Sequence, residues 1–150
     1  MHKLAVVFLL LTVLSSAACN AAPAQESMHP EPLKTRSDVM QFMLADNTSA
    51  HAYTTGVERY TCGYFARDVV LNAREQGFDA YRVIITWEGC ASHAIVLFKT
   101  DSGDVYVDAT QGDWWVEMRD GRYYSWSMTD ENFHSHYDLP IQDYFIDERL

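Results

Sequence analysis

The chain is short of positive charge. Its 150 residues include 11 Lys and Arg against 21 Asp and Glu, which gives a formal net charge of −10 at neutral pH. Nucleic acids and anionic lipid headgroups are bound through clustered Lys and Arg side chains. We therefore expect neither nucleic acid nor an anionic membrane surface to be a partner of this protein.

Long hydrophobic runs are also missing. The longest, Leu4 to Leu14, is apolar except for Thr12 and follows a short basic start that contains Lys3. A run of this length is too short to span a bilayer as a helix, but it suits the core of a signal peptide. The sequence therefore predicts an exported protein with a signal peptide at residues 1–18.

Small residues lead from Ser15 to Cys19, an arrangement that resembles a bacterial lipoprotein signal. In that signal the cysteine is lipidated and becomes the new N-terminus, so Cys19 is the candidate lipidation site. The alternative is ordinary cleavage after the sequence Ala22-Pro23-Ala24, which would release a secreted or periplasmic protein. We expect a lipoprotein on the cell envelope that touches the membrane only through its lipid anchor.

Proline is scarce, and three of the four prolines lie within residues 20–36, a stretch with little that could be buried. We interpret residues 19–36 as a flexible spacer. Residues 37–150 then form one folded domain, because a chain that is 48% hydrophobic can build a core of its own. We expect this domain to be a monomer.

Two amphipathic helices are predicted at the start of the domain. The first is capped by Ser37 and ends at residues 46–48, and the second runs from Cys62 to a stop at Gly77. The positions expected to be buried are Val39, Phe42 and Met43 in the first helix and Phe65, Ala66, Val69, Val70 and Ala73 in the second.

Alternating apolar residues then indicate strands. One strand covers Tyr81 to Trp87, and the arms of a hairpin flank the sequence Thr-Asp-Ser-Gly-Asp at residues 100–104. Asp120-Gly121 indicates the turn of a further hairpin. Helices followed by antiparallel strands predict an α+β fold in which the helices pack on an antiparallel sheet.

Three residues in these elements have the chemistry of a nucleophilic site. Cys62 is placed at a helix start, where the dipole and the unpaired N–H groups favour a thiolate. His93 opens one arm of the hairpin, and Asp108 lies in the other arm among apolar residues, where a carboxylate without a partner is costly. An imidazole activates a thiol and a carboxylate orients the imidazole, so we predict a catalytic triad of these three residues.

A non-catalytic alternative stays open. Once Cys19 is lipidated or removed, Cys62 and Cys90 remain of the three cysteines. A cysteine pair in an oxidising compartment commonly forms a disulfide. The protein would then be a binding module of the same fold, stapled by a Cys62–Cys90 disulfide.

The proposed contact between His93 and Asp108 depends on the register of the hairpin. A four-residue loop from Thr100 to Gly103, or an equivalent bulge, sets Asp108 opposite Ile95 and brings His93 within side-chain reach as its diagonal neighbour. A two-residue loop at residues 102–103 would carry Asp108 roughly 13 Å from His93. We predict the first register, with a carboxylate oxygen near one ring nitrogen and Cys62 facing the other.

In this order the motifs resemble the transglutaminase-like group of the papain-like cysteine enzymes. The segments that carry the resemblance are Cys62–Ala66, Gly77–Tyr81, His93-Ala94 and Tyr106–Thr110. The resemblance implies a transglutaminase-like, papain-like fold with the nucleophile helix packed on the sheet. It also implies acyl transfer from peptide or isopeptide amides of a peptide or protein substrate, without a cofactor. We expect hydrolysis rather than cross-linking because water is abundant and nothing marks an amine-acceptor site. Cell-envelope peptides are suggested as substrates by location alone.

The resemblance further implies that the oxyanion binds the backbone N–H of Cys62 and one upstream side chain. Tyr53 is our candidate for that side chain, with ordinary packing as the alternative. The tryptophans 87, 114 and 115 either line a substrate cleft or belong to the core. His134-Ser135-His136 lacks a further cluster of ligands nearby, so we expect no metal site there.

Overall fold

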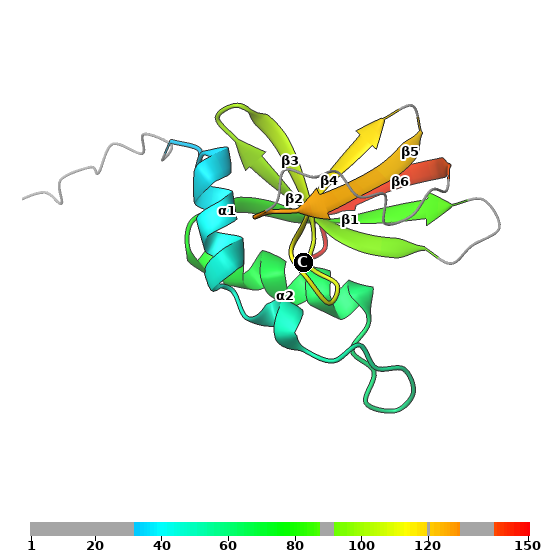
Figure 1. Ribbon diagram of the computed structural model, residues 1–150. Helices are drawn as coiled ribbons and strands as arrows, with labels where there is room; N and C mark the ends of the chain where they lie inside the picture. The colour runs from blue at the N-terminus through cyan, green and yellow to red at the C-terminus, as the bar shows by residue number, and fades with distance from the viewer. Residues whose placement is uncertain (1–31, 88–91, 120, 130–139) are drawn as a thin grey trace, which may run out of the picture. The chain divides into compact units, whose positions relative to one another are not determined.

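Two α-helices precede a six-stranded antiparallel sheet (Figure 1), which confirms the predicted α+β class. The computed structural model describes residues 32–87, 92–119, 121–129 and 140–150. The predicted signal peptide and Cys19 lie outside the described residues, as do Cys90 and the histidines at 134 and 136.

Helix α1 (Arg36–Ala45) starts one residue before the predicted domain boundary, and its cap is Thr35 rather than Ser37. The Thr35 hydroxyl accepts the N–H of Asp38 at 3.1 Å, and the Asp38 carboxylate accepts the N–H of Thr35 at 2.8 Å. The prediction of Ser37 was wrong because only Thr35 has an acidic residue three positions later to complete this reciprocal capping box. The three positions predicted to be buried in this helix are buried: Val39, Phe42 and Met43.

Helix α2 (Cys62–Glu75) begins at the predicted residue. The Thr61 backbone before it is extended, and its carbonyl accepts the N–H groups of Tyr64 and Phe65 at 2.8 and 3.1 Å. The helix ends before Gly77, whose φ of +78° lies in the left-handed region that glycine adopts without strain. All five positions predicted to form its buried face are buried: Phe65, Ala66, Val69, Val70 and Ala73.

The sheet has the strand order β5-β4-β3-β2-β1-β6, and adjacent strands are antiparallel. The strands are β1 (Asp79–Trp87), β2 (His93–Thr100), β3 (Gly103–Asp108), β4 (Trp114–Arg119), β5 (Arg122–Ser127) and β6 (Ile141–Asp147). The predicted second hairpin joins β4 to β5, where Arg119 pairs with Arg122 and Gly121 has a φ of +72°. Its other turn residue, Asp120, lies outside the described residues.

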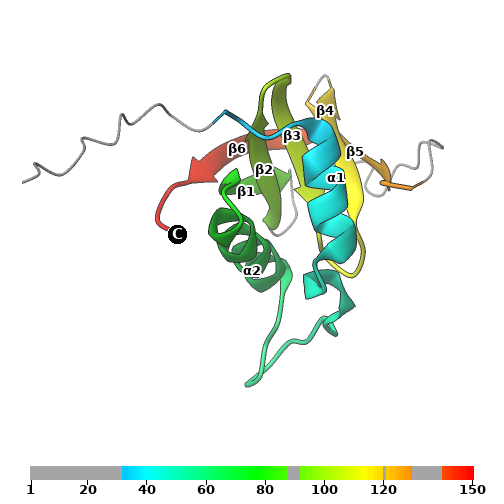
Figure 2. The same ribbon diagram turned by 90° about the vertical axis from the view of Figure 1, so that its left-hand side faces the viewer.

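The two faces of the sheet are buried in different ways. Both helices lie on one face (Figure 2), and their buried side chains share a core with Ala94, Val96 and Phe98 of β2. On the other face, Val83 of β1 shares a buried cluster with residues of β4 and β5, among them Tyr123. The rings of Trp87 in β1 and Tyr123 in β5 lie 5.7 Å apart although three strands separate β1 from β5, so the sheet curls and its inner face packs on itself.

The register of the β2–β3 hairpin is the predicted one. Thr100 pairs with Gly103, and the same register holds along both strands. Continued to the end of β3, it sets Asp108 opposite Ile95. The connecting loop is shorter than predicted and consists of residues 101–102 alone, because Thr100 and Gly103 still belong to the strands.

Replacing the observed cap should destabilise the domain, whereas replacing the cap that the sequence suggested should not. Thr35→Ala removes the capping box and should lower the free energy of unfolding by about 1 kcal/mol. The control Ser37→Ala replaces an exposed residue inside the first turn. It should change the free energy of unfolding by less than about 0.5 kcal/mol. Urea unfolding measures both, and equal losses in the two variants would contradict this assignment of the cap.

Candidate active site

Cys62 is the first residue of α2, and its side chain is half-buried. Thr61 supplies no side-chain hydrogen bond to cap the helix; only its backbone carbonyl accepts N–H groups there, from Tyr64 and Phe65. The partial positive charge of a helix N-terminus stabilises a nearby thiolate. The position therefore suits a reactive cysteine.

His93 and Asp108 meet on the inner face of the curled sheet. His93 begins β2 and Asp108 ends β3, so both lie at the same end of the hairpin. Nε2 of His93 lies 2.7 Å from Oδ2 of Asp108. Both residues are buried, with 8% of His93 and 1% of Asp108 exposed. The contact predicted from the hairpin register is therefore confirmed.

The Asp108 carboxylate is held by three donors. In addition to His93, the hydroxyl of Tyr123 donates to Oδ2 at 2.7 Å, and the backbone N–H of Thr110 donates to Oδ1 at 2.9 Å. Burial acts to raise the pKa of Asp108. The hydrogen bond and charge of His93, together with the hydrogen bonds from Thr110 and Tyr123, outweigh burial and lower that pKa below its usual value. Asp108 is therefore an anion at neutral pH.

The anion stabilises the protonated form of His93. Burial alone would lower the pKa of the imidazole, but its hydrogen bonds and charge interactions with Asp108 and Cys62 raise that pKa to about 9. Because Asp108 binds Nε2, Nδ1 is the ring nitrogen left for the interaction with Cys62. The imidazole thus joins the carboxylate to the thiol, in the order that the sequence predicts.

The sulfur of Cys62 is stabilised as an anion in return. Burial raises the pKa of the thiol, but the hydrogen bond and charge of His93, together with backbone N–H groups of Ala94 and Gly63, outweigh burial and lower it. A thiolate beside an imidazolium is a nucleophile next to a proton donor. This is the pairing needed to attack a carbonyl carbon and then protonate a leaving group.

Aromatic rings enclose the imidazole. The ring of Trp87 stacks on His93, with 5.6 Å between centroids and 17° between planes. Trp87 and Trp115 are buried in two different core clusters, so the core alternative holds for both of these tryptophans. Trp114 is partly buried and pairs with Asp108 across β3 and β4.

Tyr53, the candidate oxyanion donor, is packed rather than placed at the thiol. Its ring stacks on that of Phe65, with 6.4 Å between centroids and 11° between planes, and 42% of the residue is exposed. Among the described residues, no contact joins its hydroxyl to Cys62. The packing alternative therefore describes the position of Tyr53.

The described residues also bear on the disulfide and metal hypotheses. Cys62 carries a free thiol, and Cys90, its partner in the alternative disulfide, lies outside the described residues. Within the described ranges, no three His, Cys, Asp or Glu side chains are grouped so that they could hold a metal ion. No helix in this part of the chain is long and apolar enough to cross a membrane.

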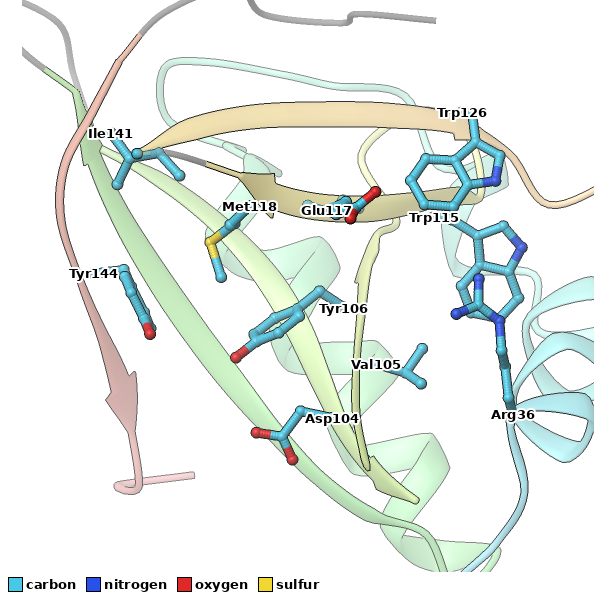
Figure 3. A pocket seen from close by; sticks show the side chains of 12 residues that line it. Arg36, Asp104, Val105, Tyr106, Trp115, Glu117, Met118, Trp126, Ile141 and Tyr144 are labelled. Atoms are coloured by element: carbon cyan, nitrogen blue, oxygen red, sulfur yellow. The ribbon is translucent and has the colours of Figure 1, made fainter. Parts of the chain in front are cut away.

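A pocket of about 580 Å³ lies between α1 and strands β3 to β6 (Figure 3). It is lined by Asp104 and Tyr106 of β3, by residues of β4 to β6 and by Arg36, whose guanidinium lies 4.3 Å from the ring centroid of Trp115. Asp104 is four residues before Asp108, roughly 13 Å along the strand. The pocket contains none of the three triad residues and is separate from the candidate site.

Comparison of the chain with protein-family models, with curated proteins and with solved structures found no match.

Two residues of the site were not found from the sequence. Thr110 uses its backbone N–H, which every residue except proline has, and Tyr123 lies 15 residues beyond Asp108 on a strand that does not adjoin β3. The sequence carries only a weak signal for Tyr123: it is one of three aromatic residues in β5, with Tyr124 and Trp126, and Tyr124 is directly adjacent, so no alternation marks its face or its partner.

Alkylation of Cys62 should show a titration midpoint below the pKa of about 8.5 that an ordinary cysteine has. His93→Gln should raise the midpoint above that value, because burial then acts on the thiol without the imidazolium that opposes it. Iodoacetamide labelling from pH 5 to 10, with peptide mapping by mass spectrometry, follows Cys62 separately from the other cysteines.

His51→Gln is the matched control for that experiment. Within the described part of the chain, the ring of His51 stacks on Tyr60 and forms a hydrogen bond with the Thr48 carbonyl, and it contacts none of the three site residues. Its loss should leave the midpoint of Cys62 unchanged. Identical midpoints in the wild type and in His93→Gln would refute the pairing of thiol and imidazole.

Proposed function

We propose that the protein is an exported cysteine enzyme of transglutaminase-like, papain-like fold that hydrolyses peptide or isopeptide amides through Cys62, His93 and Asp108. The observation that carries the proposal is the buried 2.7 Å contact between His93 and Asp108, and the same imidazole lowers the pKa of the Cys62 thiol. A structural role for these residues would require neither a thiol at a helix start nor a charged pair behind it.

The reaction follows from the protonation states of the site. The Cys62 thiolate adds to the amide carbonyl carbon, and the oxygen of the tetrahedral intermediate takes the negative charge, with the Cys62 backbone N–H as its proposed donor. The imidazolium of His93 gives its proton to the leaving amine as the C–N bond breaks, which leaves a thioester. His93, now neutral, takes a proton from water, whose oxygen attacks the thioester and releases the acid and the thiol.

The arrangement of elements supports the proposed family. The nucleophile begins a helix, and the base and the acid follow on adjacent antiparallel strands against which that helix packs. The chain order of Cys, His and Asp is that of the transglutaminase-like motifs which the sequence resembles. The three side chains come from different elements, so their convergence is not a consequence of local sequence spacing.

Amide hydrolysis by the purified protein tests the proposal. Incubation with a mixture of synthetic peptide and Nε-acyl-lysine amides in ¹⁸O-labelled water should release amines and place the label in the new carboxyl groups. Cys62→Ala should abolish release while the thermal unfolding midpoint stays close to that of the wild type. Asp108→Asn should reduce the rate by roughly 10²–10⁴-fold, because the imidazole loses its anionic partner.

Asp104→Asn is the matched control, since Asp104 lies on the same strand but is exposed and roughly 13 Å along the strand from Asp108. It should retain full activity. Release of amines that survives Cys62→Ala would overturn the proposal. Label-free products formed only when methylamine is added would instead identify transfer to amines in place of hydrolysis.

We also propose that the mature protein is held on the cell envelope by lipid at Cys19. The small residues before Cys19 and the proline-bearing stretch after it suit a tether that lets the domain stand away from the membrane. Intact-mass measurement of the membrane fraction should show a chain that begins at a lipidated Cys19. Cys19→Ser should move the protein out of that fraction, and a wild-type chain beginning at Gln25 would contradict lipidation.

A further inference from the structure

We propose that Tyr123 is a positioning residue of the candidate site, which holds the Asp108 carboxylate in place and weakens its attraction for the proton on His93. The proposal rests on the proposed function of that site. It assigns to β5 a part in chemistry whose other members belong to α2, β2 and β3.

The hydroxyl of Tyr123 donates to the same carboxylate oxygen of Asp108 that His93 contacts. Tyr123 is fully buried, and its hydroxyl donates to Oδ2 of Asp108 at 2.7 Å. The same oxygen lies 2.7 Å from Nε2 of His93. One carboxylate oxygen therefore lies between a phenol and an imidazole, whereas Oδ1 has the Thr110 N–H.

The Tyr123 ring is fixed by the aromatic groups around it. Its edge-on contact with Trp87 has 5.7 Å between centroids and 85° between planes. Its edge-on contact with the His93 ring has 6.2 Å between centroids and 83° between planes. Because Trp87 also stacks on His93, the three rings form one buried cluster in which the hydroxyl has little freedom to turn away from Asp108.

Two donors on one oxygen oppose each other. The hydroxyl of Tyr123 points the positive end of its dipole at Oδ2, and so it stabilises the carboxylate and disfavours a second positive group at the same atom. The imidazolium of His93 is that second group. A general acid works best when its pKa lies near the working pH, because a proton held too tightly is released too slowly. Tyr123 thus offsets part of the stabilisation that Asp108 gives to the imidazolium.

Tyr123→Phe tests this role because it keeps the ring and removes the hydroxyl. The pKa of His93, measured by NMR titration of its imidazole nitrogens, should rise by roughly 0.5–1 unit. In amide hydrolysis the kcat should fall several-fold, the KM should stay unchanged, and the alkaline limb of the rate profile should move to higher pH by the same shift. The NMR measurement needs no substrate, so it tests Tyr123 even where the proposed hydrolysis fails.

Tyr124→Phe is the matched control. Tyr124 is the next residue of β5 and its side chain points to the other face of the sheet. Tyr124→Phe also removes a phenolic oxygen, and this variant should leave the pKa of His93 and the kcat unchanged. A Tyr123→Phe protein that has lost only thermal stability, with the pKa of His93 and the kcat at wild-type values, would overturn the proposal and leave the proposed function standing.

A second variant covers the case in which Tyr123→Phe does not fold. Replacing Tyr123 alone by 3-fluorotyrosine keeps the ring and the hydroxyl but makes the phenol a stronger hydrogen-bond donor. The pKa of His93 should then move down, opposite to its direction in Tyr123→Phe. A shift upward, or none, in the fluorinated protein would overturn the positioning role.

Discussion

The buried carboxylate of Asp108 is the constraint on which the arrangement of this protein depends. An anion with 1% of its surface exposed is tolerated only when its oxygens have donors. Those donors come from β2, from β5 and from the turn directly after β3, as His93, Tyr123 and Thr110. The hairpin register and the curl of the sheet must both be correct for all three donors to contact the carboxylate. Fold and site are therefore specified together.

Local periodicity accounts for most of what could be predicted. The apolar face of α2 repeats at helical spacing and Gly77 stops the helix, so its bounds and its buried side were available from the sequence. The hairpin register was available because a side-chain contact between His93 and Asp108 is compatible with few loop geometries. Two residues that need each other thus helped to specify the pairing of the strands that carry them.

Long-range geometry accounts for what could not be predicted. Tyr123 contacts Asp108 although β4 lies between their strands, and it also contacts Trp87 of β1 across the curled inner face. Curl results from packing on the inner face, which no sequence period encodes.

The cap of α1 was missed for a different reason. Thr35 and Ser37 are both good caps, and the choice rests on Asp38, which is three residues after one and adjacent to the other.

The charge of the site does not depend on where its proton lies. A neutral thiol, a neutral imidazole and a carboxylate carry one negative charge, and so do a thiolate, an imidazolium and a carboxylate. Moving the proton from Cys62 to His93 therefore buries no additional net charge, and local donors decide the outcome. Backbone N–H groups of Gly63 and Ala94 stabilise the sulfur anion, and Asp108 stabilises the imidazolium. The helix start thus supports one half of the ion pair and the hairpin supports the other, so neither element would suffice without the other.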